Sequence, residues 1–201
     1  MSRLATSFVL GYHGCDAAVA GEVLAGTSEI IFSDEDHDWL GPGAYFCEAD
    51  PRRALEWAQW KASRGTYEAP SVIGAIIDLR NCLDLTTRED LELVRTSYHS
   101  FVLAQEKAGL PVPENRSPRG QPEQDHLLRY LDCAVIRHLH SMMDLQGGTG
   151  IAPYDTVRGM FTEGGRLYPG GGLHERTHVQ IAVRKPECIR GFFRPRPYPT
   201  L

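Results

Sequence analysis

The chain has 201 residues, of which 42% are hydrophobic, and it carries a formal net charge of −5. This composition argues against wholesale disorder, and the length suits one domain, residues 1–201, with a sizeable core. The five cysteines lie at least 32 positions apart, which excludes any CxxC pair and argues against a disulfide framework.

The first expected elements are a strand and a short helix joined by a His-Gly step. Ser7–Tyr12 is apolar and bounded by that step, so we expect a buried strand that ends at His13. Asp16 is a suitable N-cap for the helix that follows, and Gly26 is a suitable end for it.

A glycine-rich turn, a strand and a second helix are expected within Leu40–Trp60. Gly41 and Gly43 flank a proline, which predicts a sharp turn before a strand over Ala44–Cys47. Asp50 suits an N-cap and is followed by proline at the first helical position. The inward face of this helix is expected to comprise Ala54, Leu55 and Ala58.

The middle of the chain predicts another strand and a long helix. Ser71–Leu79 has the β-branched content of a buried strand. Thr86 and Glu89 fit a capping box for a helix that ends at Gly109. Its expected apolar positions are Leu91, Val94, Tyr98, Phe101 and Val102. Residues 111–124 contain four prolines and predict a mobile loop.

The last part predicts one helix and three strands. The helix is expected from Asp125 to about Gln146, and the strands over Asp155–Phe161, His178–Arg184 and Cys188–Phe193. Residues 162–177 separate the first two strands. This segment is too long and glycine-rich for a plain hairpin turn, so it is a candidate functional loop.

Three motifs in this order carry a family resemblance. They are YHG at 12–14, GPGAYF at 41–46 and THVQIAV at 177–183. With the flanking helices, they resemble the NAD-cleaving ADP-ribosyltransferases, and most closely the branch shared by diphtheria-like toxins and poly(ADP-ribose) polymerases. Taken alone, His13 also suits a satisfied core histidine and Tyr45 a core aromatic residue, so the assignment depends on their combination.

The resemblance implies an α+β fold in which a split, mainly antiparallel sheet with flanking helices forms a cleft for NAD, the co-substrate. By resemblance, His13 binds a ribose hydroxyl, the backbone of Gly14 holds the nicotinamide amide, and Tyr45 stacks on its ring. Gly43 and Phe46 complete the residues expected to contact NAD. Cleavage of the nicotinamide–ribose bond places positive charge on the sugar, which such a site must stabilise.

The third catalytic position departs from the strongest family pattern, which has glutamate there. Gln180 occupies that position in this chain, and its carbonyl retains the capacity to accept a hydrogen bond from a ribose hydroxyl. Glu175, five residues upstream, is the alternative if the glycine-rich loop folds inward. A neutral Gln180 argues most strongly against elongation of poly(ADP-ribose) chains.

The expected function is therefore NAD-dependent mono-ADP-ribosyl transfer to an intracellular macromolecule, as in a bacterial toxin or defence effector with a possible antitoxin or immunity protein as partner. An NAD glycohydrolase and a catalytically silent NAD or ADP-ribose-binding module are the alternatives. The N-terminus lacks a signal-peptide pattern and no apolar run suits a membrane span, so we expect a cytoplasmic protein.

The acceptor stays open between nucleic acid and protein. Residues 158–201 contain eight basic and three acidic side chains, and such a segment suits phosphates, acidic proteins or plain solvation. The candidate contacts are Arg184, Lys185, Arg190, Arg194 and Arg196. No metal site is expected, because His138 and His140 on one helix point to different faces.

Overall fold

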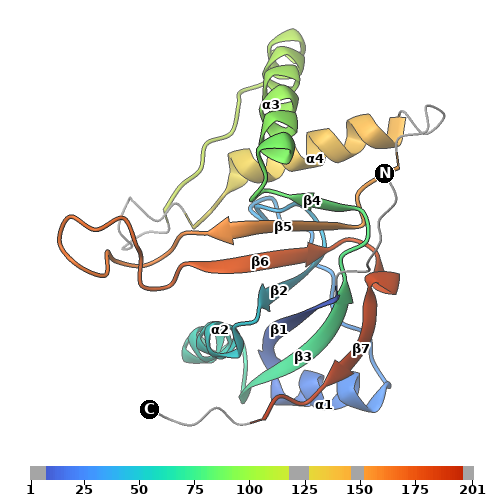
Figure 1. Ribbon diagram of the computed structural model, residues 1–201, viewed down its shortest axis with the longest axis vertical. Coiled ribbons are helices and arrows are strands. Elements are labelled where there is room, and N and C mark those ends of the chain that lie inside the picture. Colours follow the sequence, from blue (N-terminus) through green and yellow to red (C-terminus); the bar gives the residue numbers. More distant parts are fainter. Residues whose placement is uncertain (1–7, 118–126, 146–151, 197–201) are drawn as a thin grey trace.

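The computed structural model describes residues 8–117, 127–145 and 152–196. Within them, seven strands form one sheet in the order β4-β5-β6-β2-β1-β3-β7 (Figure 1). The strands are β1 (Phe8–Asp16), β2 (Ala44–Glu48), β3 (Pro70–Asp78), β4 (Cys82–Asp84), β5 (Thr156–Phe161), β6 (His178–Val183) and β7 (Ile189–Phe193). The helices are α1 (Ala17–Ala25), α2 (Pro51–Ser63), α3 (Arg88–Ala108) and α4 (Tyr130–Leu145), and the 3-10 turn η2 (Pro186–Cys188) precedes β7.

The sheet is mainly antiparallel, since β4 with β5 is the one parallel pair among these strands. β1 pairs with β3 along all its nine residues, but with β2 at Gly11 and Tyr12 alone. The short β1–β2 ladder is where the two halves of the sheet meet. The expectation of an α+β fold with a mainly antiparallel sheet is confirmed.

Apolar side chains cover both faces of the sheet. Ile181 packs in a cluster with Ala20 and Val23 of α1, whereas the next residue, Ala182, packs with Ile136 and Leu139 of α4. Successive side chains of a strand point to opposite faces, so α1 and α4 lie on opposite faces of the sheet. α3 packs on α4, and Leu93 and Val94 of α3 pack against the same cluster (Figure 1).

The expected caps of the first two helices are confirmed. The Asp16 carboxylate accepts the amide hydrogen of Ala18, and α1 ends at Gly26 with φ 71°. Asp50 caps α2, with proline at the first helical position. The end of the first strand was predicted wrongly, because pairing with β3 extends β1 through His13 to Asp16. Leu55 does not belong to the buried face of α2, since it is 37% exposed.

Beyond α2, the observed element boundaries differ from the predicted ones by a few residues. Thr87 rather than Thr86 caps α3, which ends at Gly109 as expected, and both Leu91 and Tyr98 are exposed on it. The three-residue β4 was not predicted. The helix expected from Asp125 does not include residues 127–129: the backbone of Leu128 pairs with that of Arg116 instead, and α4 begins at Tyr130. The expected helix end at 146 and the 118–124 part of the predicted loop lie outside the described residues. Among the described residues, no helix is both long and apolar enough to cross a membrane.

Candidate functional site

Three of the expected site residues lie on adjacent strands. His13 is on β1, Tyr45 on β2 and Gln180 on β6, and β2 lies between the other two. Cys47 pairs with Gln180 and also with Tyr12. Because side chains alternate along a strand, Tyr45 and Gln180 share one face, while His13 projects toward the other. A ligand that contacts all three must lie across the short β1–β2 junction.

His13 bonds to the backbone of the expected stacking residue. Its Nδ1 lies 2.8 Å from the carbonyl oxygen of Tyr45, and its ring lies 5.8 Å from that of Phe46. A carbonyl only accepts, so Nδ1 carries the proton of this hydrogen bond. Burial lowers the pKa of His13, although the Tyr45 carbonyl opposes the shift, and the ring is therefore neutral. This tautomer leaves Nε2 as an acceptor.

Tyr45 holds the glycine-rich turn in place. Its hydroxyl accepts the amide hydrogen of Leu40 at 3.0 Å and donates to the carbonyl of Gly41 at 2.9 Å. Gly41 has φ 79°, a conformation that favours glycine. Burial raises the pKa of Tyr45, with a further contribution from the charge of Asp38. The phenol is neutral, and its two hydrogen bonds hold the ring in a fixed position beside the β2–β6 ladder.

Gln180 lies in the middle of a chain of side-chain hydrogen bonds. The indole of Trp39 donates to Gln180 Oε1 at 2.7 Å, and Gln180 Nε2 lies 2.7 Å from Nε2 of His178. Nδ1 of His178 lies 2.7 Å from the carbonyl of Arg176. Gly159 pairs with Gln180 and makes room for the indole, since a Cβ there would lie 2.6 Å from the Trp39 ring.

This chain fixes both the amide orientation and the histidine tautomer. The Arg176 carbonyl requires a proton on His178 Nδ1, so Nε2 accepts from the Gln180 amide. Burial lowers the pKa of His178, and the positive charge of Arg53 lowers it further. The neutral His178 ring thus offers an acceptor to the N–H group that the neutral Gln180 amide donates. A carboxylate in place of Gln180 would keep the Trp39 bond but would bond His178 only in its protonated form.

The other three residues expected to contact NAD are packed closely against neighbouring elements of the fold. Phe46 is 2% exposed and packs in the α1 cluster. Gly43 lies against β6, where an added Cβ would be 2.7 Å from the Val183 carbonyl oxygen. Gly14 lies beneath α2, and its Cβ would be 2.1 Å from the Ala54 carbonyl oxygen. The two glycines thus permit close backbone packing, and their backbone groups remain the expected ligand contacts.

The long loop before β6 sends a carboxylate inward, but it is Glu163 rather than Glu175. Glu163 Oε2 lies 2.6 Å from Nη2 of Arg53 on α2, and Glu163 Oε1 lies 3.7 Å from Nη1 of Arg176. Glu175 is exposed and, among the described residues, makes no hydrogen bond or ion pair with Gln180. Sequence reasoning missed Glu163 because 110 positions separate it from Arg53.

The thiols near the site are not nucleophiles. Burial raises the pKa of Cys47, which pairs with Gln180, to about 12. Burial also raises the pKa of Cys15 to about 11. The thiolate is the reactive form of cysteine, so both side chains stay protonated near neutral pH and act as small apolar groups.

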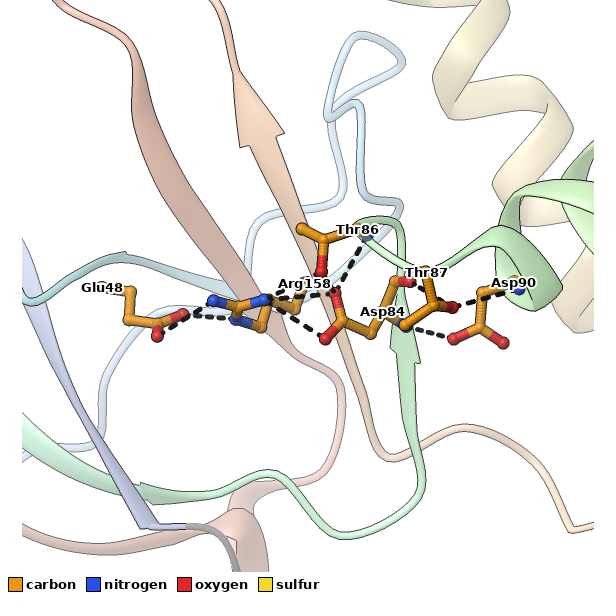
Figure 2. Close-up of polar contacts among 6 residues, drawn as sticks. All are labelled: Glu48, Asp84, Thr86, Thr87, Asp90 and Arg158. Carbon is orange, nitrogen blue, oxygen red and sulfur yellow. Dashed lines mark hydrogen bonds and ion pairs between the residues drawn. The ribbon is translucent and has the colours of Figure 1, made fainter.

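A second polar cluster braces the sheet (Figure 2). Arg158 on β5 bonds to Glu48 on β2 through Nε at 2.6 Å and to Asp84 on β4 through Nη1 at 3.2 Å. Asp84 also accepts from Thr86, and its backbone amide donates to Asp90 in the first turn of α3. All three guanidinium nitrogens of Arg158 have carboxylate partners. The side chain therefore links β5 to β2 and β4, and its charge is not available to bind a ligand.

Several basic residues near the C-terminus are engaged internally. Lys185 forms an ion pair with Asp155 at 2.6 Å, and Arg190 forms one with Asp78 at 2.7 Å. Arg184 donates to the Tyr154 carbonyl. Three of the five basic residues that were expected to contact an acceptor, Arg184, Lys185 and Arg190, therefore already have partners within the protein.

The described residues contain no group of three or more His, Cys, Asp or Glu side chains arranged for a metal ion. Comparison of the chain with protein-family models, curated proteins and solved structures finds no match. A functional assignment therefore depends on the residues of the site.

Proposed function

We propose that the protein is an NAD-dependent mono-ADP-ribosyltransferase that modifies an intracellular macromolecule, in the manner of a toxin or defence effector. The observation that carries the proposal is the fixed Gln180 amide, held by Trp39 and His178 beside the strand of Tyr45. His13, hydrogen-bonded to that strand, supplies the first position of the resemblance.

The chemistry requires groups that orient a ribose while positive charge develops on it. Gln180 Oε1 uses one lone pair for Trp39 and keeps a second for a ribose hydroxyl. Nε2 of neutral His13 is a second acceptor for the same purpose. As the nicotinamide leaves with the electrons of the bond it shared with the ribose, a nucleophilic atom of the acceptor bonds to the sugar carbon and loses its proton.

The neutral amide also favours a second candidate, a catalytically silent module that binds NAD or ADP-ribose. Both amide atoms of Gln180 already have side-chain partners, and no carboxylate stabilises the developing cation from this position. Electrostatic stabilisation of such charge is commonly the largest catalytic contribution.

If the protein is a transferase, the missing carboxylate leads us to expect a slow, single transfer of ADP-ribose rather than chain elongation.

Incubation with NAD labelled in its adenylate half separates the candidates. A transferase leaves label on a macromolecule from a cell extract, an NAD glycohydrolase releases free ADP-ribose, and a silent module leaves NAD intact. Gln180→Ala is the matched negative control, because it removes the amide from the same protein. Intact NAD after prolonged incubation with the unaltered protein would contradict the proposal.

A further inference from the structure

An aromatic pair lies on the outer side of α2. The rings of Trp57 and Trp60 stack with centroids 4.9 Å apart and an interplanar angle of 23°, and each residue is 41% exposed. Exposed tryptophans that stack on each other present a large flat apolar surface to solvent. Adjacent exposed aromatic side chains of this kind are a feature of interaction sites.

Two cations lie against these rings. The Lys61 ammonium is 5.2 Å from the Trp57 ring centroid and 5.8 Å from that of Trp60, while the Arg64 guanidinium is 4.6 Å from Trp60. Within residues 8–117, 127–145 and 152–196, neither cation has a carboxylate at ion-pair distance. Aromatic surface and uncompensated positive charge therefore coincide in this group, which we call the α2 platform: Trp57, Trp60, Lys61 and Arg64.

The α2 platform lies beside the candidate site. Arg53, Trp57, Trp60 and Arg64 follow one another at spacings of four, three and four residues, which places them along one side of the helix. Arg53 bonds to Glu163, which belongs to the loop that leads into β6 and Gln180. The platform therefore continues from the site along α2.

We propose that the α2 platform binds single-stranded nucleic acid and presents it to the site as the acceptor. Proteins that hold single strands combine aromatic rings, on which bases stack, with cations that contact the phosphates. An acidic protein partner would use the charges but has no need of a stacked tryptophan pair. The role as acceptor rests on the proposed transferase function, whereas the binding does not.

Binding is tested by the fluorescence anisotropy of a dye-labelled oligothymidylate, without NAD. The double variant Trp57→Leu/Trp60→Leu should bind the probe at least about tenfold more weakly, because each stacked base is lost. Arg52→Gln is the matched control on the same helix, since Arg52 pairs with Glu56 and, among the described residues, makes no cation–ring contact with Trp57 or Trp60. Its affinity should change less than twofold. Equal affinities of the tryptophan variant and the unaltered protein would overturn the proposal.

The charges are tested by the salt dependence of the same binding. Lys61→Gln/Arg64→Gln leaves both rings in place and removes two phosphate contacts. The slope of log affinity against log salt should become shallower by about 1.4, since each contact with a single strand contributes roughly 0.7. An unchanged slope, or stronger displacement of the probe by polyglutamate than by unlabelled oligothymidylate, would reject a nucleic-acid surface in favour of an acidic protein partner.

Labelled NAD then links the platform to the reaction. The tryptophan variant should keep the nicotinamide release of the unaltered protein but transfer at least about tenfold less label to the oligonucleotide, with the remaining ADP-ribose transferred to water and recovered free. Label transferred to protein alone would overturn the acceptor role. If the unaltered protein binds the probe through the tryptophans yet never cleaves NAD, the proposed function fails while the binding surface stands. Thermal midpoints of the variants show that each is folded.

Discussion

Loss of Arg53 should destabilise the protein strongly, because it would leave a buried carboxylate without its main partner. The side chains of Arg53 and Glu163 are 11% and 7% exposed and their charged atoms are 2.6 Å apart. Removal of one member of a buried ion pair costs about 3–5 kcal/mol. Arg176 remains 3.7 Å from the same carboxylate with a half-exposed side chain. We therefore expect Arg53→Leu to lower the free energy of unfolding by about 3 kcal/mol.

Urea unfolding followed by circular dichroism measures this loss. Arg52→Leu is the control from the same helix, because the Arg52 side chain is 73% exposed and its ion pair should contribute less than about 0.5 kcal/mol. The double variant Arg53→Leu/Glu163→Leu removes both charges and should recover most of the stability. The reasoning fails if Arg53→Leu is as stable as Arg52→Leu, or if the double variant is no more stable than Arg53→Leu.

Three further variants test other parts of the structure. Neither ring nitrogen of His140 has a partner in the described structure, and burial lowers its pKa from 6.5 to about 3. The unfolded chain therefore binds the extra proton, and stability is lost as the pH falls from about 6.5, by roughly 1.4 kcal/mol per unit. His140→Leu should flatten this dependence in urea titrations and raise stability at pH 7. Gly14→Ala should lower the thermal midpoint, since its Cβ would meet a carbonyl oxygen of α2 at 2.1 Å, whereas Gly21→Ala, with open space, should not. Trp39→Phe removes the donor to Gln180 and should slow nicotinamide release at least about tenfold with little change in NAD affinity. Equal rates would assign Trp39 to packing alone.

Local signals in the sequence predicted much of the fold. Asp16 and Asp50 act on amides within three residues, and both caps were found where expected. The strand runs of β3, β5, β6 and β7 were also found, because buried strands need β-branched and apolar residues whatever their neighbours. β4 was missed, since its three residues are held by pairing with β5 rather than by their own pattern.

The site could be predicted only in part. The motifs suggested His13, Tyr45 and Gln180, which the sheet brings onto adjacent strands. Trp39, which donates to Gln180, had no local signal, because it is 141 positions away in sequence. His178, two residues from Gln180, offered a possible signal, since alternate residues of a strand share a face. The direction of His13 depends on the β1–β2 register, which no sequence pattern specified.

The central claim is tested most directly by the rate of nicotinamide release from NAD by purified Gln180 variants. Gln180→Ala should lose about 10²-fold or more, whereas Gln180→Glu, which restores a charge and keeps the Trp39 bond, should equal or exceed the unaltered protein. Glu175→Gln should leave the rate unchanged. Release that survives in Gln180→Ala but collapses in Glu175→Gln would contradict the account and transfer the catalytic role to the loop.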